Sequence, residues 1–346
     1  MPVRVHVCEP GWEAVLIDEL ATDFPASQHR KRAAGWVESE FTGEDHGRTP
    51  TVAFAAQCLP DVIPVTAPSI SRWADLAADQ ILGRLADHQS AWRLHVFHID
   101  VPGGSRRCAL IQDGVRSELR ERRRRLARQM VDGSASGWQP GEALVQLGLV
   151  TASEGYLSFC ASELRQRLRR CISPLSGGRF EAPRDLRAPS RAFAKLAEAE
   201  AIMRRAIQTG ETCVDLGSSP GSWAWWAIRS GASVIAIDRS PLRADLIEHP
   251  RLTFVRGDAF RYQPESPVDW LLSDVIAFPE RIAELLELWI GERWCRQFCV
   301  TIKFRGREDY GKLERIKKLL ERSPVEFTLR RLTSNKNEAT AFGQLT

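Results

Sequence analysis

Residues 212–238, with the sequence TCVDLGSSPGSWAWWAIRSGASVIAID, decide the fold of this chain. Two short aliphatic segments flank a turn that contains Gly217, Pro220 and Gly221, and a helix-like run follows the turn. This order predicts a strand, a turn, a helix and a second parallel strand. The glycines let the backbone approach a ligand closely, and Asp238 at the end of the second strand is placed to accept both ribose hydroxyls of a nucleoside.

The composition of the turn indicates which nucleoside binds there. A dinucleotide site uses the pattern G-x-G-x-x-G, so that backbone N–H groups and a helix N-terminus hold a pyrophosphate. Residues 217–222 read GSSPGS, which lacks the middle glycine and includes a proline without an N–H group. We therefore expect a phosphate-free nucleoside, S-adenosylmethionine, with Asp215 near its amino acid end. The alternatives are a glycine turn that only ends a strand and a nicotinamide dehydrogenase, which bound NAD would support.

Length, composition and charge are those of a globular protein. The chain has 346 residues, which suggests two domains, with 43% hydrophobic and 27% charged residues. No apolar run reaches the ~18 residues that cross a bilayer, and the first residues do not resemble a signal peptide, so we expect a cytoplasmic protein. The net charge of +4 suits a polyanionic partner. The eight cysteines include no C-x-x-C pair, so we expect reduced packing residues and no metal site.

The first half alternates short apolar runs with helix-like segments, which predicts a small α+β region. Strands are expected at 3–8, 34–41, 51–59 and 92–99 and within 143–160, and helices at 11–24 and 69–87. Residues 169–189 then gather prolines and glycines with few apolar residues, a composition typical of a linker. We therefore expect a first domain at 1–175 and a second at 176–346.

Residues 105–132 form an arginine-rich, helix-like stretch, in which Leu119, Leu126 and Met130 make a thin apolar stripe. Four consecutive arginines repel one another unless an anion is near, and RNA phosphate is the natural candidate. The RNA-binding residues expected here are Arg122, Arg123, Arg124 and Arg125. A solvated helix face without a partner is the alternative.

The second half alternates strands and helices, which predicts a doubly wound, mostly parallel sheet with ligands over the carboxyl ends of its strands. Strands are expected at 212–216, 233–237, 252–256, 268–274, 298–304, 325–332 and 338–344, and helices at 190–207, 221–230, 279–291 and 309–322. The last two strands have no helix between them and should form an antiparallel hairpin at the edge of the sheet.

Four ionisable residues of this half are candidates for catalysis: Lys195, Asp274, Lys303 and Glu338. Three of them lie at strand ends, which meet in one crevice in this topology. A lysine acts as a base only after losing its proton, which burial and a second ammonium nearby promote. We assign Lys303 as the base that deprotonates a hydroxyl, with the other three holding it in place. Surface salt bridging is the alternative for any one of the four taken alone.

Two competing methyl acceptors fit the sequence less well. Amino-group methylation usually goes with an Asn/Asp-Pro-Pro-aromatic turn, whereas residues 273–276 read SDVI. Carbon methylation of cytosine needs a cysteine nucleophile, and neither Cys295 nor Cys299 ends a strand in a proline-containing turn. A ribose hydroxyl is the favoured acceptor.

The motifs VDLGSSPGSW, SDV, IKF and NEAT resemble those of the FtsJ-like RNA ribose 2'-O-methyltransferases, whose Lys-Asp-Lys-Glu tetrad maps onto Lys195, Asp274, Lys303 and Glu338. APSRAFAKLAEA, SDVIAFPERIAELLELWIGERWCRQF and CEPGWEAVLIDEL are similar to the members that methylate a cytidine ribose of bacterial 23S rRNA. The resemblance implies a Rossmann-like class I methyltransferase domain preceded by an α+β, ferredoxin-like and THUMP-like RNA-binding region. The arginine-rich stretch motivates the main alternative to an enzyme, a catalytically inactive RNA-binding or ribosome-assembly protein that retains this fold.

By the same resemblance, the S-adenosylmethionine site is lined by Asp215, Gly217, Ser218, Pro220, Gly221, Trp223, Asp238 and Asp258, with Asp258 near the adenine. The implied partner is 23S rRNA, naked or in an early assembly precursor, and the implied state is a monomer without metal or membrane. Two departures stand out. The family turn has two glycines after the proline where this chain has Gly221 and Ser222, and residues 304–306 read FRG where the relatives have a leucine and a proline.

Overall fold

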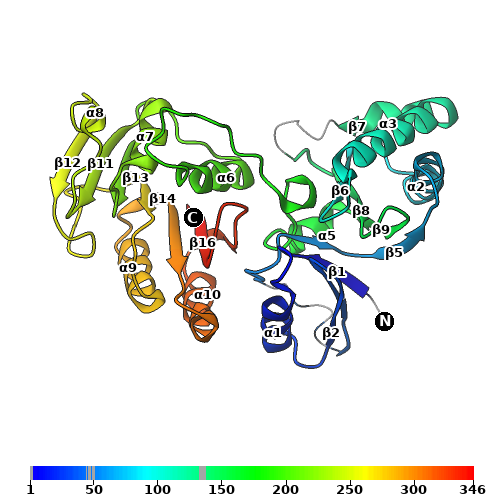
Figure 1. Cartoon of the computed structure of the whole chain (residues 1–346), viewed down its shortest axis with the longest axis horizontal. Helices are drawn as coiled ribbons and strands as arrows, with labels where there is room; N and C mark the ends of the chain where they lie inside the picture. The colour runs from blue at the N-terminus through cyan, green and yellow to red at the C-terminus, as the bar shows by residue number, and fades with distance from the viewer. Residues whose placement is uncertain (1–2, 44, 46–47, 49–50, 132–137) are drawn as a thin grey trace. The chain divides into compact units, whose positions relative to one another are not determined.

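The computed structural model describes residues 3–43, 45, 48, 51–131 and 138–346 (Figure 1). The chain forms two compact units, Met1–Arg179 and Phe180–Thr346. The division falls within the stretch whose proline and glycine content predicts a linker, whereas the expected boundary follows residue 175.

The first unit begins with a four-stranded antiparallel sheet in the order β2-β3-β1-β4. Its elements are β1 (Val3–Val7), α1 (Glu13–Asp23), β2 (Gln28–Ala33), β3 (Trp36–Glu40) and β4 (Gln57–Leu59). Val5, Val7 and Trp36 pack in its core. Strand β2 was not predicted because its sequence, QHRKRA, is polar; it lies at the sheet edge, where Arg30 pairs with Glu38 across the strands at 2.8 Å. The strand expected at 51–59 is limited to β4.

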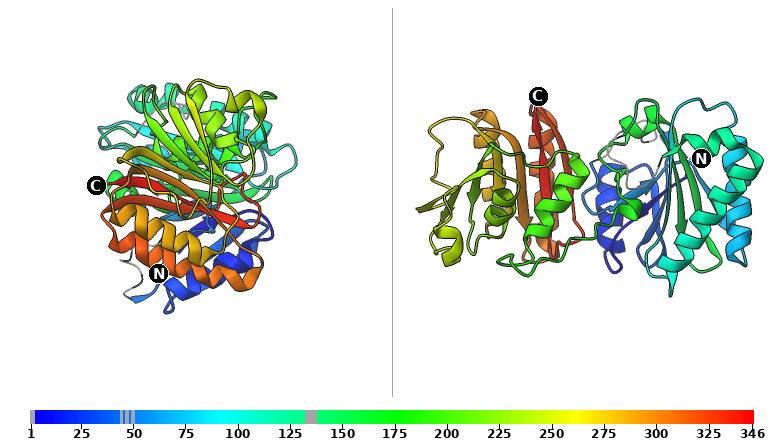
Figure 2. Two further views of the ribbon diagram at one scale, coloured as in Figure 1. Left: turned by 90° about the vertical axis from the view of Figure 1, so that its left-hand side faces the viewer. Right: turned by 90° about the horizontal axis from the view of Figure 1, so that it is seen from above.

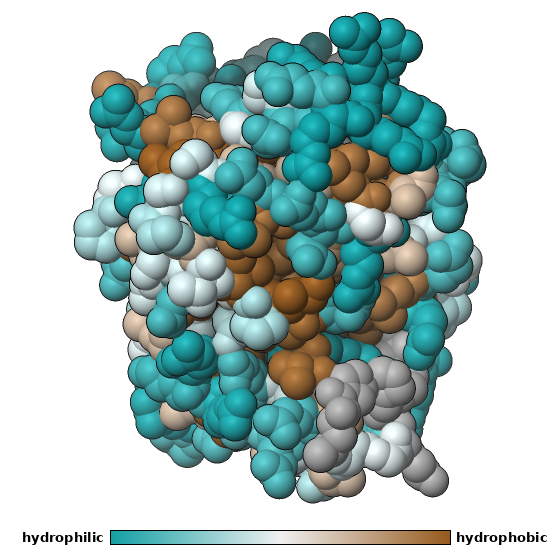
Figure 3. Space-filling model, turned by 90° about the vertical axis from the view of Figure 1, so that its right-hand side faces the viewer, coloured by the Kyte–Doolittle hydropathy of each residue, from teal (hydrophilic) through white to brown (hydrophobic). Residues whose placement is uncertain are grey.

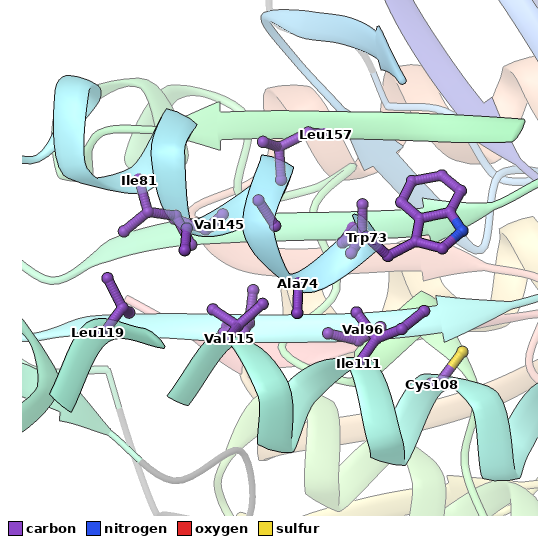
Figure 4. Close-up of a cluster of buried hydrophobic side chains, with 14 of the residues drawn as sticks. Trp73, Ala74, Ile81, Val96, Cys108, Ile111, Val115, Leu119, Val145 and Leu157 are labelled. Atoms are coloured by element: carbon purple, nitrogen blue, oxygen red, sulfur yellow. The ribbon is translucent and has the colours of Figure 1, made fainter. Parts of the chain in front are cut away.

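The second sheet of this unit has five strands in the order β5-β9-β8-β6-β7. Its elements are β5 (Val62–Thr66), α2 (Ile70–Arg84), β6 (Trp92–His98), α3 (Gly104–Arg122), α4 (Arg124–Gln129), β7 (Met130–Val131), β8 (Ala143–Leu149), β9 (Glu154–Cys160), α5 (Ser162–Arg167) and the 3-10 turn η2 (Ser176–Gly178). Helices α2 and α3 pack against one another and onto the strands through one buried apolar cluster (Figure 4). Gly114 allows this approach, since a Cβ there would lie 2.7 Å from that of Ala74.

The arginine-rich stretch is not the single helix that its sequence predicts. Helix α3 ends at Arg122, Arg123 is not helical, with φ −153° and ψ 78°, and α4 begins at Arg124. The predicted stripe is partly confirmed, because Leu119 and Leu126 are buried whereas Met130 is half-buried in β7. The last residue of the predicted helix, 132, lies outside the described residues.

The second unit is built on a seven-stranded sheet in the order β12-β11-β10-β13-β14-β16-β15. Its elements are α6 (Phe193–Met203), β10 (Thr212–Leu216), α7 (Ser222–Arg229), β11 (Ser233–Asp238), α8 (Ala244–Ile247), β12 (Leu252–Arg256), β13 (Val268–Ser273), α9 (Pro279–Gly291), β14 (Cys295–Lys303), the 3-10 helix η3 (Arg307–Lys312), α10 (Leu313–Arg322), β15 (Val325–Arg330) and β16 (Glu338–Leu345). The strands from β10 to β14 are parallel, and β16 is antiparallel to both neighbours.

Helices cover both faces of this sheet, which makes it the doubly wound, Rossmann-like arrangement that the sequence predicts. Helices α6 and α7 pack on one face, and α9 and α10 pack together on the other (Figure 2). The predicted hairpin of β15 and β16 is present, but β16 lies inside the sheet between β14 and β15. Cys295 and Cys299 both belong to β14, which begins earlier than expected.

All eight cysteines are buried and free, and no helix of the described residues is long and apolar enough to cross a membrane. Within the same residues, no group of three or more His, Cys, Asp or Glu side chains is arranged to hold a metal ion. Figure 3 shows a mostly hydrophilic face with apolar residues gathered in a central band.

Candidate active site

The four candidate catalytic residues come together at the end of the seven-stranded sheet where its parallel strands terminate. Asp274 directly follows β13 and Lys303 ends β14, so parallel pairing of these strands brings both to the same end. Strand β16 runs in the opposite direction, and its first residue, Glu338, pairs in register with Lys303. Lys195 reaches the group from α6. Sheet topology therefore assembles residues that are far apart in the sequence.

The contacts among the four side chains are short and centred on Asp274. The Nζ of Lys195 lies 2.9 Å and 3.0 Å from the two carboxylate oxygens of Asp274, and 2.7 Å from Oε1 of Glu338. The Nζ of Lys303 donates to the backbone carbonyl of Asp274 at 2.7 Å and lies 3.2 Å from its Oδ1. Two ammonium groups and two carboxylates thus form one neutral cluster.

Burial distinguishes the two lysines. The side chain of Lys195 is 9% exposed and that of Lys303 is 25% exposed. A buried charge is tolerated when it is paired and hydrogen-bonded, a requirement that Lys195 meets fully through Asp274 and Glu338. Lys303 contacts two oxygens of a single residue, so one tetrahedral position of its Nζ stays open. These contacts differ from an exposed surface salt bridge, where both partners are solvated.

A cavity of about 480 Å³ adjoins the cluster on the side of the glycine turn. Its lining includes seven of the eight residues expected around S-adenosylmethionine, namely Asp215, Gly217, Ser218, Pro220, Trp223, Asp238 and Asp258. Gly221 lies beside it at the start of α7, with φ 106°. Gly217 has φ 74°, and a Cβ there would lie 2.7 Å from that of Val275, so the turn needs glycine at this position.

The backbone of the turn is unsuited to a pyrophosphate. The N–H groups of Gly217 and Ser218 donate to the carbonyl of Ile237, at 2.9 Å and 3.3 Å. The N–H of Gly221 donates to Ser218, and that of Ser219 donates to Asp238 at 2.9 Å. Since Pro220 has no N–H, the amide groups that would hold phosphates in a dinucleotide site are used within the protein.

Two buried polar atoms in the lining of this cavity lack a partner. Among the described residues, Oδ1 of Asp215 and Oγ of Ser218 accept or donate no hydrogen bond, although Oδ2 of Asp215 accepts from the N–H of Ala224 at 3.0 Å. Burial raises the pKa of Asp215 to about 8, and nearby Asp274 and Asp238 add to the rise. Buried polar groups are normally satisfied, so the two atoms fit a ligand that carries hydrogen-bond donors.

The other cofactor candidates are held in fixed positions. The carboxylate of Asp238 accepts the N–H groups of Ser219 and Ser240, which leaves further lone pairs for hydroxyl donors. Asp258 accepts the N–H of Phe260 and pairs with Arg239 at 2.6 Å, and these contacts lower its pKa. Trp223 is buried and donates its indole N–H to the carbonyl of Ala192, so it forms a rigid wall.

A second, larger cavity of about 870 Å³ also adjoins the catalytic cluster, and Lys195, Lys303 and Glu338 line it. Ala192, Ile276 and Lys303 line both cavities. The cluster therefore stands at the partition between two spaces, with Lys303 accessible from each. Ile276, which the sequence did not single out, is 87% exposed at this partition. The only signal that could have found it is its position directly after the strand end at Asp274.

The arginines predicted to bind RNA lie in the first unit, and three of the four have partners within the protein. Arg122 pairs with Asp79 at 2.6 Å. Arg123 and Arg125 donate to the carbonyl of Ala86, at 3.2 Å and 2.7 Å. Arg124 has no hydrogen-bond or ion-pair partner in the part of the chain that the structure describes. The repulsion within the run is therefore relieved largely by internal contacts, and the run by itself does not require an external anion.

Comparison with known proteins agrees with this geometry. Residues 188–303 match the family described as FtsJ-like methyltransferase. The chain is 39% identical over 155 residues to the ribosomal RNA large subunit methyltransferase M of Stutzerimonas stutzeri (strain A1501), an alignment that covers 43% of each chain. The protein of that name from Laribacter hongkongensis (strain HLHK9) is 35% identical over 181 residues, which cover 49% of this chain and 51% of the relative.

These alignments span about half the length of the relatives they match. A longer alignment joins the chain to the ribosomal RNA large subunit methyltransferase M of Pseudomonas fluorescens (strain SBW25), at 29% identity over 344 residues. It covers 93% of this chain and 88% of the relative. The likeness therefore extends through both units.

Proposed function

We propose that this chain, whose residues 188–303 form an FtsJ-like methyltransferase domain, is an S-adenosylmethionine-dependent RNA ribose 2'-O-methyltransferase. The observation that carries the proposal is the cluster of Lys195, Asp274, Lys303 and Glu338 at the partition between two cavities. A methyl donor in one cavity and a hydroxyl acceptor in the other would meet beside Lys303.

The charges of the two cavities fit this division. Four aspartates line the smaller cavity, of which Asp215 has a raised pKa, against two cations, Arg239 and Lys303. Five cations line the larger one against a single carboxylate, that of Glu338, which is already paired with Lys195. An acidic wall suits a sulfonium and an amino group, and a basic wall suits an RNA phosphate backbone. The cofactor belongs in the smaller cavity and the RNA in the larger.

The residues of the smaller cavity fit S-adenosylmethionine. The unpartnered oxygens of Asp215 and Ser218 would accept hydrogen bonds from its amino group, and the carboxylate of Asp238 would accept them from its ribose hydroxyls. The adenine would contact the N–H and carboxylate groups around Asp258. When bound, the cofactor supplies a methyl group on a positively charged sulfur. The internally satisfied turn amides support a nucleoside without phosphates over a dinucleotide.

Lys303 is the base in this mechanism. A neutral amine has two N–H groups and one lone pair, and the Nζ of Lys303 contacts two oxygens of Asp274, so the neutral form would direct its two N–H groups to them. The lone pair therefore points from the remaining position toward the cavities and takes the proton of the 2'-hydroxyl. Asp274 fixes both lysines, and Lys195, which is itself paired with Glu338, holds Asp274 in place. Much of the rate acceleration then comes from alignment.

The substrate we propose is a cytidine of 23S rRNA, naked or in an early assembly precursor. The names of the relatives, which specify the large ribosomal subunit, support this choice. The first unit acts as a ferredoxin-like and THUMP-like RNA-binding region. Of the run Arg122, Arg123, Arg124 and Arg125, Arg124 is the member expected to contact the phosphates, because the other three have partners within the protein. The domain limits proposed from the sequence are 1–175 and 176–346. The protein works in the cytoplasm as a monomer.

Methyl transfer from labelled S-adenosylmethionine to 23S rRNA transcribed in vitro tests the proposal. Nuclease digestion should place the label in a 2'-O-methylated nucleoside, and Lys303→Ala should lower the rate by about 10²–10⁴-fold because the base is lost. Arg307→Ala is the matched control, since Arg307 is exposed nearby and lines neither cavity. Label in a base would refute ribose methylation. If the RNA stayed unlabelled with the wild type as well as with both variants, an inactive RNA-binding or ribosome-assembly protein would be favoured.

A further inference from the structure

The larger cavity contains features that the chemistry of methyl transfer does not explain. Three of its cationic side chains, Arg191, Arg305 and Lys336, are exposed and play no part in the catalytic cluster. Within the described residues, none of the three side chains has a hydrogen-bond or ion-pair partner. Unpaired like charges around one cavity repel each other, so the arrangement favours a ligand that carries several negative charges.

The same cavity presents apolar side chains to solvent. Phe278 is 44% exposed and Ile276 is 87% exposed, and both belong to the loop that leads from Asp274 into α9. The guanidinium of Arg305 lies 4.1 Å from the centroid of the Phe278 ring. A ring with a guanidinium over it forms a planar stack, and such stacks are extended by nucleobases in single-stranded RNA.

The position of the Phe278 ring is set by rigid neighbours. Phe278 immediately precedes Pro279, the first residue of α9, which fixes the backbone at the helix start. On the side of Arg305, the preceding residue Phe304 is buried and packs edge-on against Tyr310, whose hydroxyl donates to Asn337 at 2.6 Å. The stack is therefore held by the strand ends that carry the catalytic cluster.

We propose that this cavity binds an unstacked nucleotide of single-stranded RNA, with its base on the Phe278–Arg305 stack and its flanking phosphates against Arg191 and Lys336. A cavity of about 870 Å³ accommodates a nucleotide with parts of its neighbours, since ligand pockets span about 300–1,000 Å³. This inference rests on the proposed function, because it places the acceptor nucleotide beside Lys303. Phe278 and Arg305 are thus positioning residues for the acceptor and do not take part in proton transfer.

The test is the affinity of the full chain for a fluorescein-labelled, short single-stranded oligocytidylate, measured by fluorescence anisotropy. Phe278→Ala should weaken binding about tenfold, and Phe278→Trp should restore it, because stacking requires an aromatic face. Arg305→Ala should weaken binding and lower its salt dependence. Leu288→Ala, on the same helix and 38% exposed, and Arg307→Ala are the controls and should bind like the wild type.

Duplex RNA of the same sequence should bind all variants equally, because paired bases cannot reach the stack. Since the first unit can also bind RNA, an oligonucleotide containing 4-thiouridine locates the contact by photo-cross-linking. Cross-links are expected within residues 276–278 or 303–306, and Phe278→Ala should remove them. Cross-links confined to residues 1–179, or unchanged binding and cross-linking by Phe278→Ala, would overturn the proposal.

Two further measurements separate the possible failures. Affinity for S-adenosylhomocysteine, measured by calorimetry, should match the wild type in every variant and so shows that the unit is folded. If the wild type labels ribose while Phe278→Ala binds and methylates normally, the stacking site is wrong and the proposed function stands. If no ribose is labelled but Phe278→Ala no longer binds single-stranded RNA, the proposed stacking site stands and the proposed ribose acceptor is wrong.

Discussion

At the scale of single residues, the structure explains why a set of common amino acids forms a specific site. Lys195, Asp274, Lys303 and Glu338 would each be unremarkable on a protein surface. Here Asp274 joins both lysines within 3.2 Å, and Glu338 completes the partners of Lys195. Removing any one of them leaves an unbalanced charge in a partly buried place, which is costly.

Asp215 gives a prediction about pH. Burial raises its pKa from 3.8 to about 8, so between these values the folded protein keeps a proton that the unfolded chain has lost. The stability contribution of the protonated carboxyl is complete below pH 4 and is lost as the pH rises through about 8, by at most about 1.4 kcal/mol per pH unit. Asp215→Asn, which cannot titrate, should flatten this dependence.

Urea unfolding of the ligand-free protein at several pH values between 5 and 8 measures the effect. The wild type should lose more stability across this range than Asp215→Asn does. Asp258→Asn is a useful control, because the pKa of Asp258 is lowered and its titration lies below the range. Parallel curves for wild type and Asp215→Asn would show that Asp215 is ionised in the folded protein.

Gly217 gives a prediction about the cofactor turn. A methyl group at this position would lie 2.9 Å from the backbone Cα of Val275, and the φ of 74° is unfavourable for any residue with a Cβ. Gly217→Ala should therefore displace the turn and weaken binding of S-adenosylhomocysteine about tenfold or more in calorimetry. Gly210→Ala has a similar positive φ but open space around it, and should change stability without changing this affinity.

At the scale of elements, the order of strands decides which side chains meet. The insertion of β16 between β14 and β15 places Glu338 opposite Lys303. The antiparallel hairpin at the sheet edge that the sequence predicts is confirmed, but the sequence did not show that its second strand, β16, is the one that pairs with β14. Likewise, the break at Arg123 divides the arginine-rich stretch into α3 and α4, so its arginines do not share one helical face.

The arginines of α3 and α4 separate into two groups with different expected roles. Arg122, Arg123 and Arg125 hold the helices to residues 79–89, whereas Arg120, Arg124 and Arg128 are exposed and have no partner within the described part of the chain. Replacing the second group by glutamine should weaken rRNA binding about equally across sequences and flatten its salt dependence, because phosphate contacts carry no sequence information.

Filter binding at several salt concentrations, together with thermal unfolding, distinguishes the two groups. The double variant Arg123→Gln and Arg125→Gln should lower the thermal stability of the first unit. It should leave the dependence of RNA affinity on salt concentration nearly unchanged. Equal salt slopes for the wild type and for the triple variant at 120, 124 and 128 would indicate that these helices form only a solvated face.

At the scale of the whole molecule, the two units have separable tasks in the proposed function. Both cavities and the entire catalytic cluster are built from residues of Phe180–Thr346. We therefore expect residues 180–346, expressed alone, to bind S-adenosylhomocysteine as tightly as the full chain but to methylate 23S rRNA with a much lower kcat/KM, since the phosphate contacts of the first unit are lost.

Calorimetry and the labelled-methyl assay on both proteins check this expectation. Addition of the separate first unit, residues 1–179, should not restore kcat/KM at equal concentrations, because covalent linkage supplies a high effective concentration. Full methylation by residues 180–346 alone would show that the first unit contributes nothing to recognition of this RNA.

The sequence by itself determined the βαβ unit at 212–238, the alternation of the second half and the choice of the candidate catalytic and cofactor residues. These features depend on local periodicity, on turns that only glycine and proline permit, and on motifs that are contiguous in the chain. The same reasoning missed β2, because a polar edge strand lacks apolar alternation, and it missed the short helix α8.

Only the tertiary structure decided how the parts meet. It placed β16 inside the sheet, satisfied Arg122, Arg123 and Arg125 with partners 37–43 positions away in the chain, and brought Phe278 beneath Arg305. It also brought Lys303 into the lining of both cavities. Contacts of this kind depend on the packing of distant segments, and periodicity within a short window carries no information about which distant segments pack together.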